Sequence, residues 1–483
     1  MRTLDKDLLS VQEVRDKIAE AKRAQGKLKE YSQEQIDRIV YAISVAGQEN
    51  SERLAKMAKE ETGYGKWKDK LIKNIFASKF VYDSIKDMKT VGIIREDKES
   101  KVFDVAVPVG VIAALIPSTN PTSTVIFKAL VALKAGNAVV FSPHPSAKNC
   151  IQEAARICAD TAVKSGAPEG IITCLDTLSG PGTKELLGHR DVSLILATGG
   201  EAMVRAAYSS GTPAIGVGPG NAPVFIERTA DIPKAVGHII DSKTFDNGVI
   251  CASEQAIVVE HCSKEAVTSE LRRRGAYFMD AAESELVGSL LLLPNKATNP
   301  AVVGKSAAEV ASMVGIDVPE DTPLLISEQS SVSYNNPYSR EKLTPVLALY
   351  TETDWESACE RCLELLANEG LGHTLIIHSK DERVIREFGL KKTVSRVLVN
   401  TPGALGGVGA TANLQPSFTL GCGAVGGGST SDNVGPLHLF NVRRVAYGVR
   451  ELSDLTGGGN SNTGTGSANF EQMVSKILQM FKN

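Results

Sequence analysis

The stretch VGVIAALIPSTNPTSTVIFKALVALKAGNAVVFSPHPSA, residues 109–147, decides the fold. Two apolar runs, VGVIAALIP and NAVVFSP, flank a segment that predicts a helix over 123–135. Strands that are apolar on both faces are typical of a parallel sheet covered by helices on both sides. The stretch therefore predicts a strand–helix–strand unit, with the polar loops PSTNPTS and SPHPSA after its two strands.

The same alternation continues beyond this unit. A helix at 146–165, the run GIITCL, a short helix, the run VSLILAT, a helix at 201–209 and the run PAIGV follow in order. Strands that alternate with helices predict an α/β fold with a doubly wound parallel sheet. The loops SGPGT and ATGGEA are also small and polar, and ligands of such sheets bind beyond the carboxyl ends of the strands. We therefore expect a cofactor at these loops.

The regions on either side have their own patterns. The first ninety residues predict helices, one of which begins with a capping box made by Ser32 and Gln35. A second α/β unit begins near 222 with APVFIE. Its further elements are a strand at 254–260, a helix at 263–274, PVLALY, a helix at 355–367, HTLIIHS and RVLVN; a glycine-rich loop at 403–435 follows. We place domain boundaries at 1–225, 226–432, 433–456 and 457–483.

The tail combines a linker and an amphipathic segment. TGGGNSNTGTGSA (456–468) has the composition of a flexible linker. In the segment after it, one helical face carries Phe470, Met473, Val474, Ile477 and Phe481. A helix this short is marginal alone. It either docks onto another surface or is a frayed or self-docked terminus.

Composition excludes several classes of protein. The chain is 42% hydrophobic and 23% charged with a net charge of −3, so we expect no nucleic-acid footprint. The start is charged and no apolar run approaches a membrane span, which predicts a soluble cytosolic protein. We interpret the eight cysteines as thiols, and the CERC pair (Cys359, Cys362) as helix packing rather than a redox or zinc half-site. The seven histidines show no ligand spacing, so no metal site is predicted. The run GCGAVG (421–426) matches GxGxxG, but no helix pattern follows it.

One cysteine stands apart from the others. Cys251 lies in FDNGVICASEQ (245–255), where a loop of small and polar residues leads into an apolar strand. A thiolate adds readily to carbonyl carbons and gives a reactive thioester. Such a site also needs a donor for the oxyanion that forms. A loop cysteine taken alone is either structural or a nucleophile of this kind.

These residues together resemble the aldehyde dehydrogenase superfamily, and most closely its coenzyme-A-acylating branch, over roughly 10–450. TFDNGVICASEQ is similar to the nucleophile loop, and Asn120 matches the asparagine that helps hold the oxyanion. The resemblance implies a Rossmann-like NAD-binding domain, an α/β catalytic domain and a small β oligomerisation element. It further implies that NAD contacts Pro117, Ser118, Thr119, Ser142, Pro143, His144, Thr198, Gly199, Gly200 and Glu341, and that His373 contacts NAD or coenzyme A unless it merely caps a strand.

Two departures from the family pattern refine the expected reaction. Hydrolytic members carry a glutamate base in a segment matching IGVGPGNAP (215–223), but here no Asp or Glu occurs between Glu201 and Glu227. Without that base, water attacks a thioester poorly, whereas a thiol needs less help. We therefore expect an aldehyde, coenzyme A and NAD⁺ to give acyl-CoA and NADH. The second departure is Ser142, which stands where typical members place a lysine and leaves the choice of NAD over NADP open.

Alternatives to this reaction remain at this point. They are a hydrolytic dehydrogenase, a relative that makes or reduces an acyl phosphate, and a non-catalytic scaffold of the same fold. The sequence does not fix the aldehyde; acetaldehyde and propionaldehyde are the leading candidates.

The resemblance extends to assembly and location. Acylating members housed in bacterial microcompartments carry a similar linker and short helix, so we expect residues 469–483 to bind a shell protein and place the enzyme in the compartment lumen. The family also implies a homodimer or homotetramer, formed through strands at 97–108 and 438–450.

Overall fold

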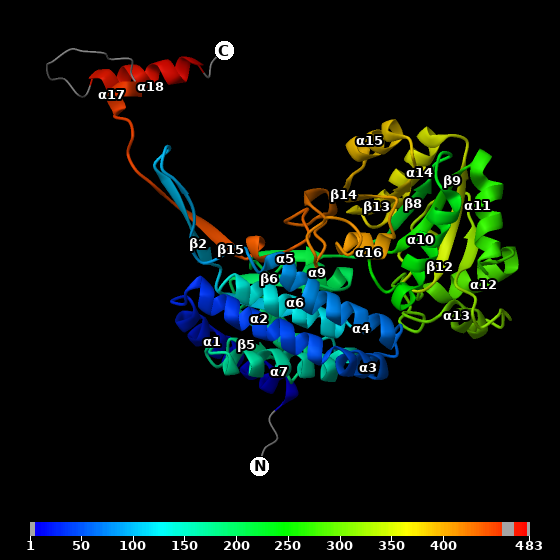
Figure 1. Cartoon of the computed structure of the whole chain (residues 1–483), viewed down its shortest axis with the longest axis horizontal. Coiled ribbons are helices and arrows are strands. Elements are labelled where there is room, and N and C mark those ends of the chain that lie inside the picture. The colour runs from blue at the N-terminus through cyan, green and yellow to red at the C-terminus, as the bar shows by residue number, and fades with distance from the viewer. Residues whose placement is uncertain (1–4, 456–467, 481–483) are drawn as a thin grey trace. The chain divides into compact units, whose positions relative to one another are not determined.

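The computed structural model describes residues 5–455 and 468–480. The chain forms a larger unit of residues 1–91 and 108–441 and a smaller unit of residues 92–107 and 442–483. The larger unit contains two parallel sheets with their helices (Figure 1). The α/β architecture with parallel sheets predicted from the sequence is therefore present.

Helices fill the start of the larger unit, as predicted. They are α1 (Lys6–Leu28), α2 (Gln33–Glu49), α3 (Ser51–Thr62), α4 (Trp67–Ile75), a π-helical turn (Phe76–Phe80) and α5 (Val81–Ile85). The capping box is confirmed, because the Ser32 side chain accepts the Gln35 N–H while the Gln35 side chain accepts the Ser32 N–H. These two bonds satisfy donors that the first turn of a helix leaves unpaired.

The first sheet has five parallel strands in the order β5-β4-β3-β6-β7. Its strands are β3 (Val111–Leu115), β4 (Ala138–Ser142), β5 (Ile172–Cys174), β6 (Leu194–Thr198) and β7 (Ala214–Val217). The connecting helices are α6 (Pro121–Lys134), α7 (Lys148–Lys164), α8 (Gly180–Gly188) and α9 (Glu201–Tyr208). After β3, the chain adds β4 and β5 on one side of that strand. It then crosses over and adds β6 and β7 on the other side, so the strand order reverses between β3 and β6.

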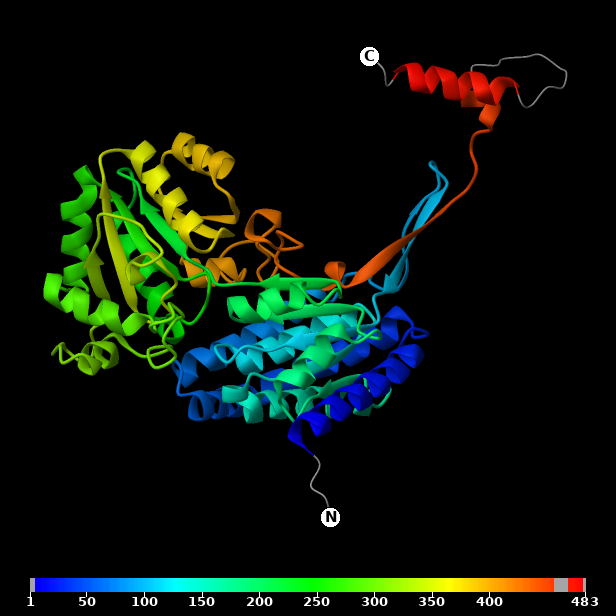
Figure 2. The same ribbon diagram turned by 180° about the vertical axis from the view of Figure 1, so that it is seen from behind.

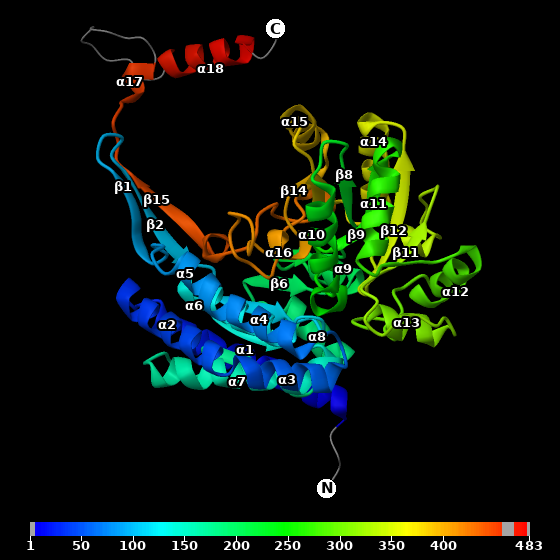
Figure 3. The ribbon, with the colours of Figure 1, turned by 45° about the vertical axis from the view of Figure 1, so that its right-hand side comes forward.

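Helices cover both faces of this sheet. Right-handed crossovers place α6 and α7 on one face and α8 and α9 on the other. Helix α1 packs against α8 and β4, whereas α2 packs outside α6 and α7, as Figure 3 shows. The strands are buried on both sides, which explains why their sequences are continuously apolar.

The second sheet has seven parallel strands in the order β10-β11-β12-β9-β8-β13-β14. They are β8 (Ala222–Ile226), β9 (Glu254–Glu260), β10 (Tyr277–Phe278), β11 (Leu325–Glu328), β12 (Val346–Glu352), β13 (Gly372–His378) and β14 (Val394–Val399). The change from the first sheet to the second falls between Val217 and Ala222, just before the boundary we placed at 225.

Two hydrophobic clusters hold the helices on this second sheet. Phe225 and Val258 point into one cluster, whereas their neighbours Val224 and Ile257 point into the other. Opposite views in Figure 1 and Figure 2 show helices on both sides of the strands. The helices are α10 (Ile232–Thr244), α11 (His261–Arg273), α12 (Ala281–Leu291), α13 (Ala307–Met313), α14 (Trp355–Asn368), α15 (Glu382–Lys391) and α16 (Gly403–Gly407). The CERC cysteines are buried on α14, as the packing interpretation predicts.

The smaller unit contains a three-stranded sheet in the order β1-β2-β15. Its strands are β1 (Gly92–Asp97), β2 (Val102–Pro108) and β15 (Phe440–Ala446), and β1 and β2 form an antiparallel hairpin. Strand β2 lies within the strand expected over roughly 97–108 but begins later, because the chain turns at 98–101, where Lys101 takes a φ of 53°. The second expected strand, at 438–450, is shorter than predicted.

Two short helices, α17 (Leu452–Leu455) and α18 (Ala468–Met480), lie near the end of the chain. Helix α18 agrees with the amphipathic helix predicted there, and Val474, Ile477 and Leu478 are exposed on it. The linker at 456–467 and Phe481 lie outside the described residues. Among the described helices, none has the length and apolar character to cross a membrane.

Candidate active site

Cys251 follows a strained turn at the end of α10. Residues 245–248 form a 3₁₀ turn in which Asp246 and Asn247 have φ of 48° and 55°. Non-glycine residues rarely take positive φ, so each costs free energy unless its neighbours hold it. The Asn247 side chain is held by the Gly304 carbonyl, to which it donates at 2.9 Å. The turn leads directly into the loop that carries Cys251 and then into β9.

Two buried lysines on α4 hold Asp246. Lys70 donates to Asp246 Oδ2 at 3.0 Å, and Lys73 donates to the same oxygen. The Lys66 backbone N–H donates to Oδ1 at 2.6 Å. A buried carboxylate is tolerated where it is paired and hydrogen-bonded, and Asp246 has both kinds of partner. Helix α4 is therefore fastened to the turn before the cysteine.

Asn120 is joined to the same cluster. It occupies the N-cap of α6, where an asparagine side chain ordinarily accepts an N–H of the first turn, but it makes no such bond. Instead, Asn120 Oδ1 accepts from Lys73 Nζ at 2.6 Å, and Nδ2 donates to Thr119 Oγ1 at 3.2 Å. The structure thus connects the two predicted catalytic residues, Asn120 and Cys251, through Lys73 and Asp246.

The environment of Cys251 disfavours the thiolate, which is the charged form of its side chain. Burial, followed by the charges of Glu341 and Cys422, raises the pKa of Cys251 to about 12, although Arg396 acts in the opposite direction. Glu341 is also perturbed, because burial followed by the charge of Glu369 raises its pKa to about 8. Both groups are therefore largely protonated at neutral pH, and the thiol needs a proton acceptor before it can attack a carbonyl.

Gly220 lies beside Cys251 and beside two further predicted residues, Glu341 and His373. Its N–H donates to Glu341 Oε1 at 2.9 Å. A Cβ at position 220 would lie 2.0 Å from the Cys251 carbonyl oxygen and 3.4 Å from His373 Cδ2, so only glycine fits between them. Cys251, Glu341 and His373 are therefore close together, at the amino-terminal edge of the second sheet.

His373 is a buried neutral imidazole at the start of β13. Burial, its largest influence, lowers the pKa of His373 to about 3. Its Nδ1 lies 2.9 Å from Thr374 Oγ1, whereas Nε2 has no hydrogen-bond partner within the described part of the chain. A buried nitrogen without a partner is uncommon and suits a group that acts on a bound molecule.

Sequence interpretation missed Arg396, which supports this histidine. Its guanidinium donates to Thr374 Oγ1 at 3.2 Å, to the His373 carbonyl at 3.0 Å and to the Gly421 carbonyl at 2.8 Å. Arg396 therefore binds the glycine-rich loop to β13 beside the thiol. The available signal was a lone arginine inside the strand-like run VSRVLV (394–399).

The predicted cofactor residues of the first sheet lie at one edge. Strands β3, β4 and β6 are neighbours and parallel, so their carboxyl ends share that edge. Residues 117–119, 142–144 and 198–200 lie at or directly after these strand ends. The reversal of strand order lies between β3 and β6, which is where sheets of this type bind ligands.

These loops suit a dinucleotide. A Cβ built at Gly200 would meet nothing within 4 Å, so the backbone before α9 is open to close approach. A helix N-terminus of this kind favours phosphate groups. His144 has a local function, because its Nδ1 accepts the Ser146 N–H at 3.2 Å and caps a short turn.

Lys128 on α6 is a second residue that sequence interpretation missed. Its ammonium donates to the carbonyls of Leu115 at 2.8 Å and Leu196 at 2.9 Å, near the ends of β3 and β6. Burial lowers the pKa of Lys128 to about 7. The signal was a single lysine inside the apolar helix VIFKALVAL.

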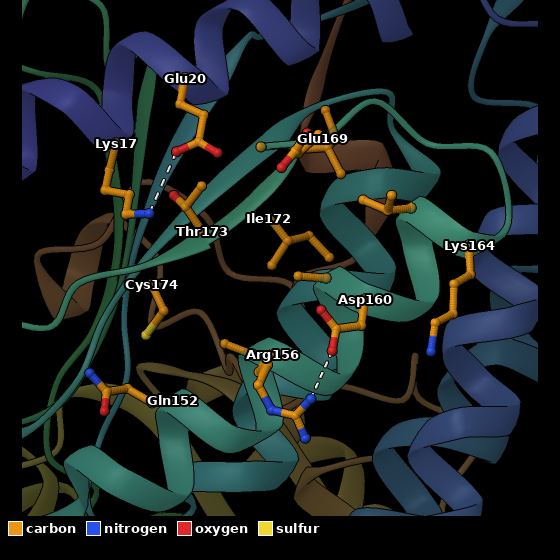
Figure 4. Close-up of a pocket in the computed structure, with 15 residues that line it drawn as sticks. Lys17, Glu20, Gln152, Arg156, Asp160, Lys164, Glu169, Ile172, Thr173 and Cys174 are labelled. Atoms are coloured by element: carbon orange, nitrogen blue, oxygen red, sulfur yellow. Dashed lines mark hydrogen bonds and ion pairs between the residues drawn. The ribbon is translucent and has the colours of Figure 1, made fainter.

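A cavity of about 460 Å³ lies elsewhere, beside the edge strand β5 (Figure 4). Figure 4 shows Lys17 and Glu20 from α1 paired with each other on one side, and Arg156 and Asp160 from α7 paired on the other. Cys174 also lines it. The predicted site residues do not line this cavity, and its charged side chains are largely paired, so it is not the candidate active site.

Comparison with known proteins supports the family assignment. Residues 6–313 match the model of the aldehyde dehydrogenase family. The chain is 45% identical over 442 residues to the bifunctional aldehyde-alcohol dehydrogenase AdhE of Escherichia coli (strain K12), covering 90% of this chain and 50% of that protein. It thus spans about half the length of the curated relatives it first matches. It is 37% identical to the succinate-semialdehyde dehydrogenase (acetylating) of Clostridium kluyveri, covering 91% and 96% of the two chains.

Solved structures show the same fold. A probable aldehyde dehydrogenase from Listeria monocytogenes EGD-e is 60% identical, with a TM-score of 0.93 over 94% of this chain and 100% of that one. A propionaldehyde dehydrogenase from the Clostridium phytofermentans fucose utilisation bacterial microcompartment is 29% identical, with a TM-score of 0.82 over 90% and 97%. A Rhodopseudomonas palustris propionaldehyde dehydrogenase, solved with bound CoA and an acylated cysteine, is 28% identical, with a TM-score of 0.81 over 90% and 97%. The chain therefore belongs to the aldehyde dehydrogenase family.

Proposed function

We propose that this protein is a coenzyme-A-acylating aldehyde dehydrogenase. It converts a short-chain aldehyde, coenzyme A and NAD⁺ reversibly into acyl-CoA and NADH. The observation that carries the proposal is the Cys251 loop itself, held by Asp246 and tied through Lys73 to Asn120. An acylated cysteine and bound CoA in the similar Rhodopseudomonas palustris enzyme support the same chemistry here.

Cys251 and Asn120 have distinct roles in the proposed oxidation. The Cys251 sulfur, once deprotonated, adds to the aldehyde carbonyl carbon, and the negative charge develops on oxygen. Asn120 Nδ2 and the Cys251 backbone N–H donate to that oxygen. NAD⁺ is the hydride acceptor when it is bound, and the carbon that has lost its hydride remains on sulfur as a thioester.

Acyl transfer then goes to a thiol rather than to water. The segment 215–223 contains no carboxylate, and Gly220 packs so closely on Cys251 that no side chain fits at that position. His373 Nε2, neutral and unpaired among the described residues, would accept a hydrogen bond from the coenzyme A thiol and orient it toward the thioester. The coenzyme A sulfur attacks the thioester carbon, the acyl group moves to it, and the Cys251 sulfur leaves and recovers a proton.

NAD has a natural position in the proposed complex. The loops at 117–119, 142–144 and 198–200 would hold its adenosine and phosphates, and Glu341 would hold the nicotinamide ribose. Ser142 carries no positive charge at the position where typical members place a lysine, and a 2′-phosphate usually requires a basic partner, so the proposal takes NAD as the cofactor.

A direct assay tests the proposed reaction. NADH formation is measured with aldehydes of two to four carbons, with and without coenzyme A, and with NADP⁺ in place of NAD⁺. We expect NADH formation to depend on coenzyme A and acyl-CoA to appear in equal amount. Equal rates and free acid without coenzyme A would instead identify a hydrolytic dehydrogenase, and no turnover at all would identify a scaffold.

We also propose how the protein assembles. The exposed β1-β2-β15 sheet pairs with a second copy, which gives a homodimer or homotetramer. Helix α18 binds a shell protein and places the enzyme in a bacterial microcompartment, where a volatile aldehyde is confined. Exposed apolar residues on α18 and the microcompartment origin of the similar Clostridium phytofermentans enzyme support this.

A further inference from the structure

The orientation of the Asn120 amide is set by a lysine on another helix. Lys73 Nζ donates to Asn120 Oδ1 at 2.6 Å. A charged lysine has three donors and no acceptor, so the amide atom facing it must be the oxygen. The NH₂ group consequently points away from Lys73. In the opposite amide orientation, two donors would face each other in a partly buried site, and neither would have an acceptor there.

A second contact agrees with this orientation. Asn120 Nδ2 donates to Thr119 Oγ1 at 3.2 Å, which places the NH₂ group on the side of the PSTN loop. Asn120 also leaves the α6 N–H groups uncapped, although its N-cap position favours that bond. The side chain is therefore held for a purpose other than starting the helix.

We propose that Lys73 is a positioning residue that fixes the Asn120 amide with its NH₂ group toward the oxyanion, and that Asp246 holds Lys73 for this purpose. The proposal rests on the proposed function, in which Asn120 donates to the oxyanion. Lys73 acts through Asn120 and does not itself touch the substrate.

Asp246 gives this arrangement its link to the nucleophile. It lies in the same turn that leads to Cys251, and its Oδ2 accepts from both Lys73 and Lys70. The Asp246 backbone N–H in turn donates to Asp69 Oδ2 at 2.7 Å. Helix α4 therefore contacts both Asn120, the proposed oxyanion donor, and the turn that leads to Cys251.

Lys70 provides a matched comparison on the same helix. It is buried like Lys73 and binds the same Asp246 oxygen, but it reaches the Thr119 backbone carbonyl at 3.3 Å rather than the Asn120 amide. Replacement of Lys70 removes one of the two lysines that pair with Asp246 but keeps the hydrogen bond from Lys73 to the Asn120 amide. The two lysines therefore separate positioning of Asn120 from general support of the turn.

A double-mutant cycle tests the proposal. The native chain, Lys73→Met, Asn120→Ala and the double variant are compared for coenzyme-A-dependent NADH formation, with Lys70→Met in the same two backgrounds. We expect Lys73→Met to lower kcat about 10- to 100-fold with KM little changed, since a transition-state donor is lost. In the Asn120→Ala background, Lys73→Met should have almost no further effect, whereas Lys70→Met should lower kcat by the same factor in both backgrounds.

Three results would overturn the proposal. The first is that Lys73→Met lowers kcat by the same factor in the native chain and in Asn120→Ala. The second is that Lys73→Met leaves both kcat and KM unchanged in the native chain. The third is that it changes KM alone. If Lys73→Met does not fold, the cycle is run with Lys73→Ala, which likewise carries no donor for Asn120, and the same outcomes decide. A native chain without coenzyme-A-dependent activity would contradict the proposed function instead, so the two failures are distinguishable.

Discussion

At the scale of single residues, the surroundings of Cys251 favour the protonated thiol over the thiolate. Burial raises its pKa to about 12, and the neighbouring carboxyl group of Glu341 acts in the same direction. A cysteine activated in the free enzyme would have a lowered pKa instead. Activation in this protein must therefore accompany binding of substrate and cofactor, which change what surrounds the sulfur.

This state predicts the pH dependence of alkylation. In the free enzyme, the rate at which iodoacetamide modifies Cys251 should rise about tenfold per pH unit between about pH 7 and pH 9, because the thiolate fraction rises by that factor below the pKa. Peptide mapping by mass spectrometry follows the modification, with Cys251→Ala as the blank. A rate that levels off near neutral pH would show a thiolate already formed.

The sequence was informative for some residues and silent for others. Cys251 and Asn120 belong to motifs with a recognisable pattern, so both could be named in advance. Lys73 and Asp246 could not, because a lysine on an amphipathic helix ordinarily faces solvent. Its burial depends on a carboxylate 173 residues away in sequence, and only the folded chain brings the two together.

At the scale of elements, a buried lysine joins the carboxyl ends of β3 and β6. Lys128 donates to one carbonyl near the end of each strand, which holds the two loops that would bind NAD. These two hydrogen bonds stabilise the fold. A buried carbonyl without a partner loses the hydrogen bonds that water gives it in the unfolded chain.

Replacement of this lysine should therefore destabilise the fold. We expect Lys128→Met to lower the free energy of unfolding by about 1–3 kcal/mol, measured by urea denaturation. The exposed Lys164→Met on α7 should change it by less than about 0.5 kcal/mol. A Lys128→Met protein as stable as the native chain would contradict the role given to these bonds.

The pH dependence of that loss has a definite sign. The pKa of Lys128 is lowered to about 7, so between pH 7 and about 10.5 the unfolded chain binds a proton that the folded chain does not. The native chain is therefore more stable at high pH, and Lys128→Met should cost more at about pH 9 than at about pH 7. A cost that stays constant between about pH 7 and pH 9 would instead show that the lysine remains charged when buried.

Elements were predictable where the pattern is strong. The apolar runs of both parallel sheets match the strands, and the strand predicted over 254–260 coincides with β9. The first strand of the β1–β2 hairpin was missed because β1 is short and largely exposed, and half of its residues are charged. Its turn depends on Lys101, whose positive φ has no marker in the sequence.

At the scale of the whole molecule, the small sheet presents apolar side chains to solvent. Val442 on β15 and the nearby Tyr447 and Val449 are all exposed. Exposed apolar groups on a sheet with free edges are typical of an interface. They support the proposed contact with a second copy of this chain.

Charged substitutions there should prevent assembly. We expect the native chain to have the mass of a dimer or tetramer by light scattering, and Val442→Asp with Val449→Asp to have the mass of a monomer. Two desolvated carboxylates in an interface cost far more than the contact gains. An unchanged mass would place the interface elsewhere on the molecule.

The tail should be separable from catalysis. Deletion of 457–483 is expected to leave coenzyme-A-dependent activity within about a factor of two, because none of the predicted site residues lies in that segment. The same deletion should abolish co-purification with microcompartment shells. Shell association that survives the deletion would contradict the role proposed for α18, whereas a large loss of activity would tie the tail to the site.

The most direct test of the whole account is a search for the acyl group on Cys251. The native chain is mixed with propionyl-CoA in the absence of NADH, quenched in acid and analysed as an intact protein and as peptides. We predict a mass increase equal to one propionyl group, located at Cys251 and absent from Cys251→Ala. A native chain that remains unmodified, or a propionyl group found on another residue, would contradict the claim that this sulfur carries the acyl group.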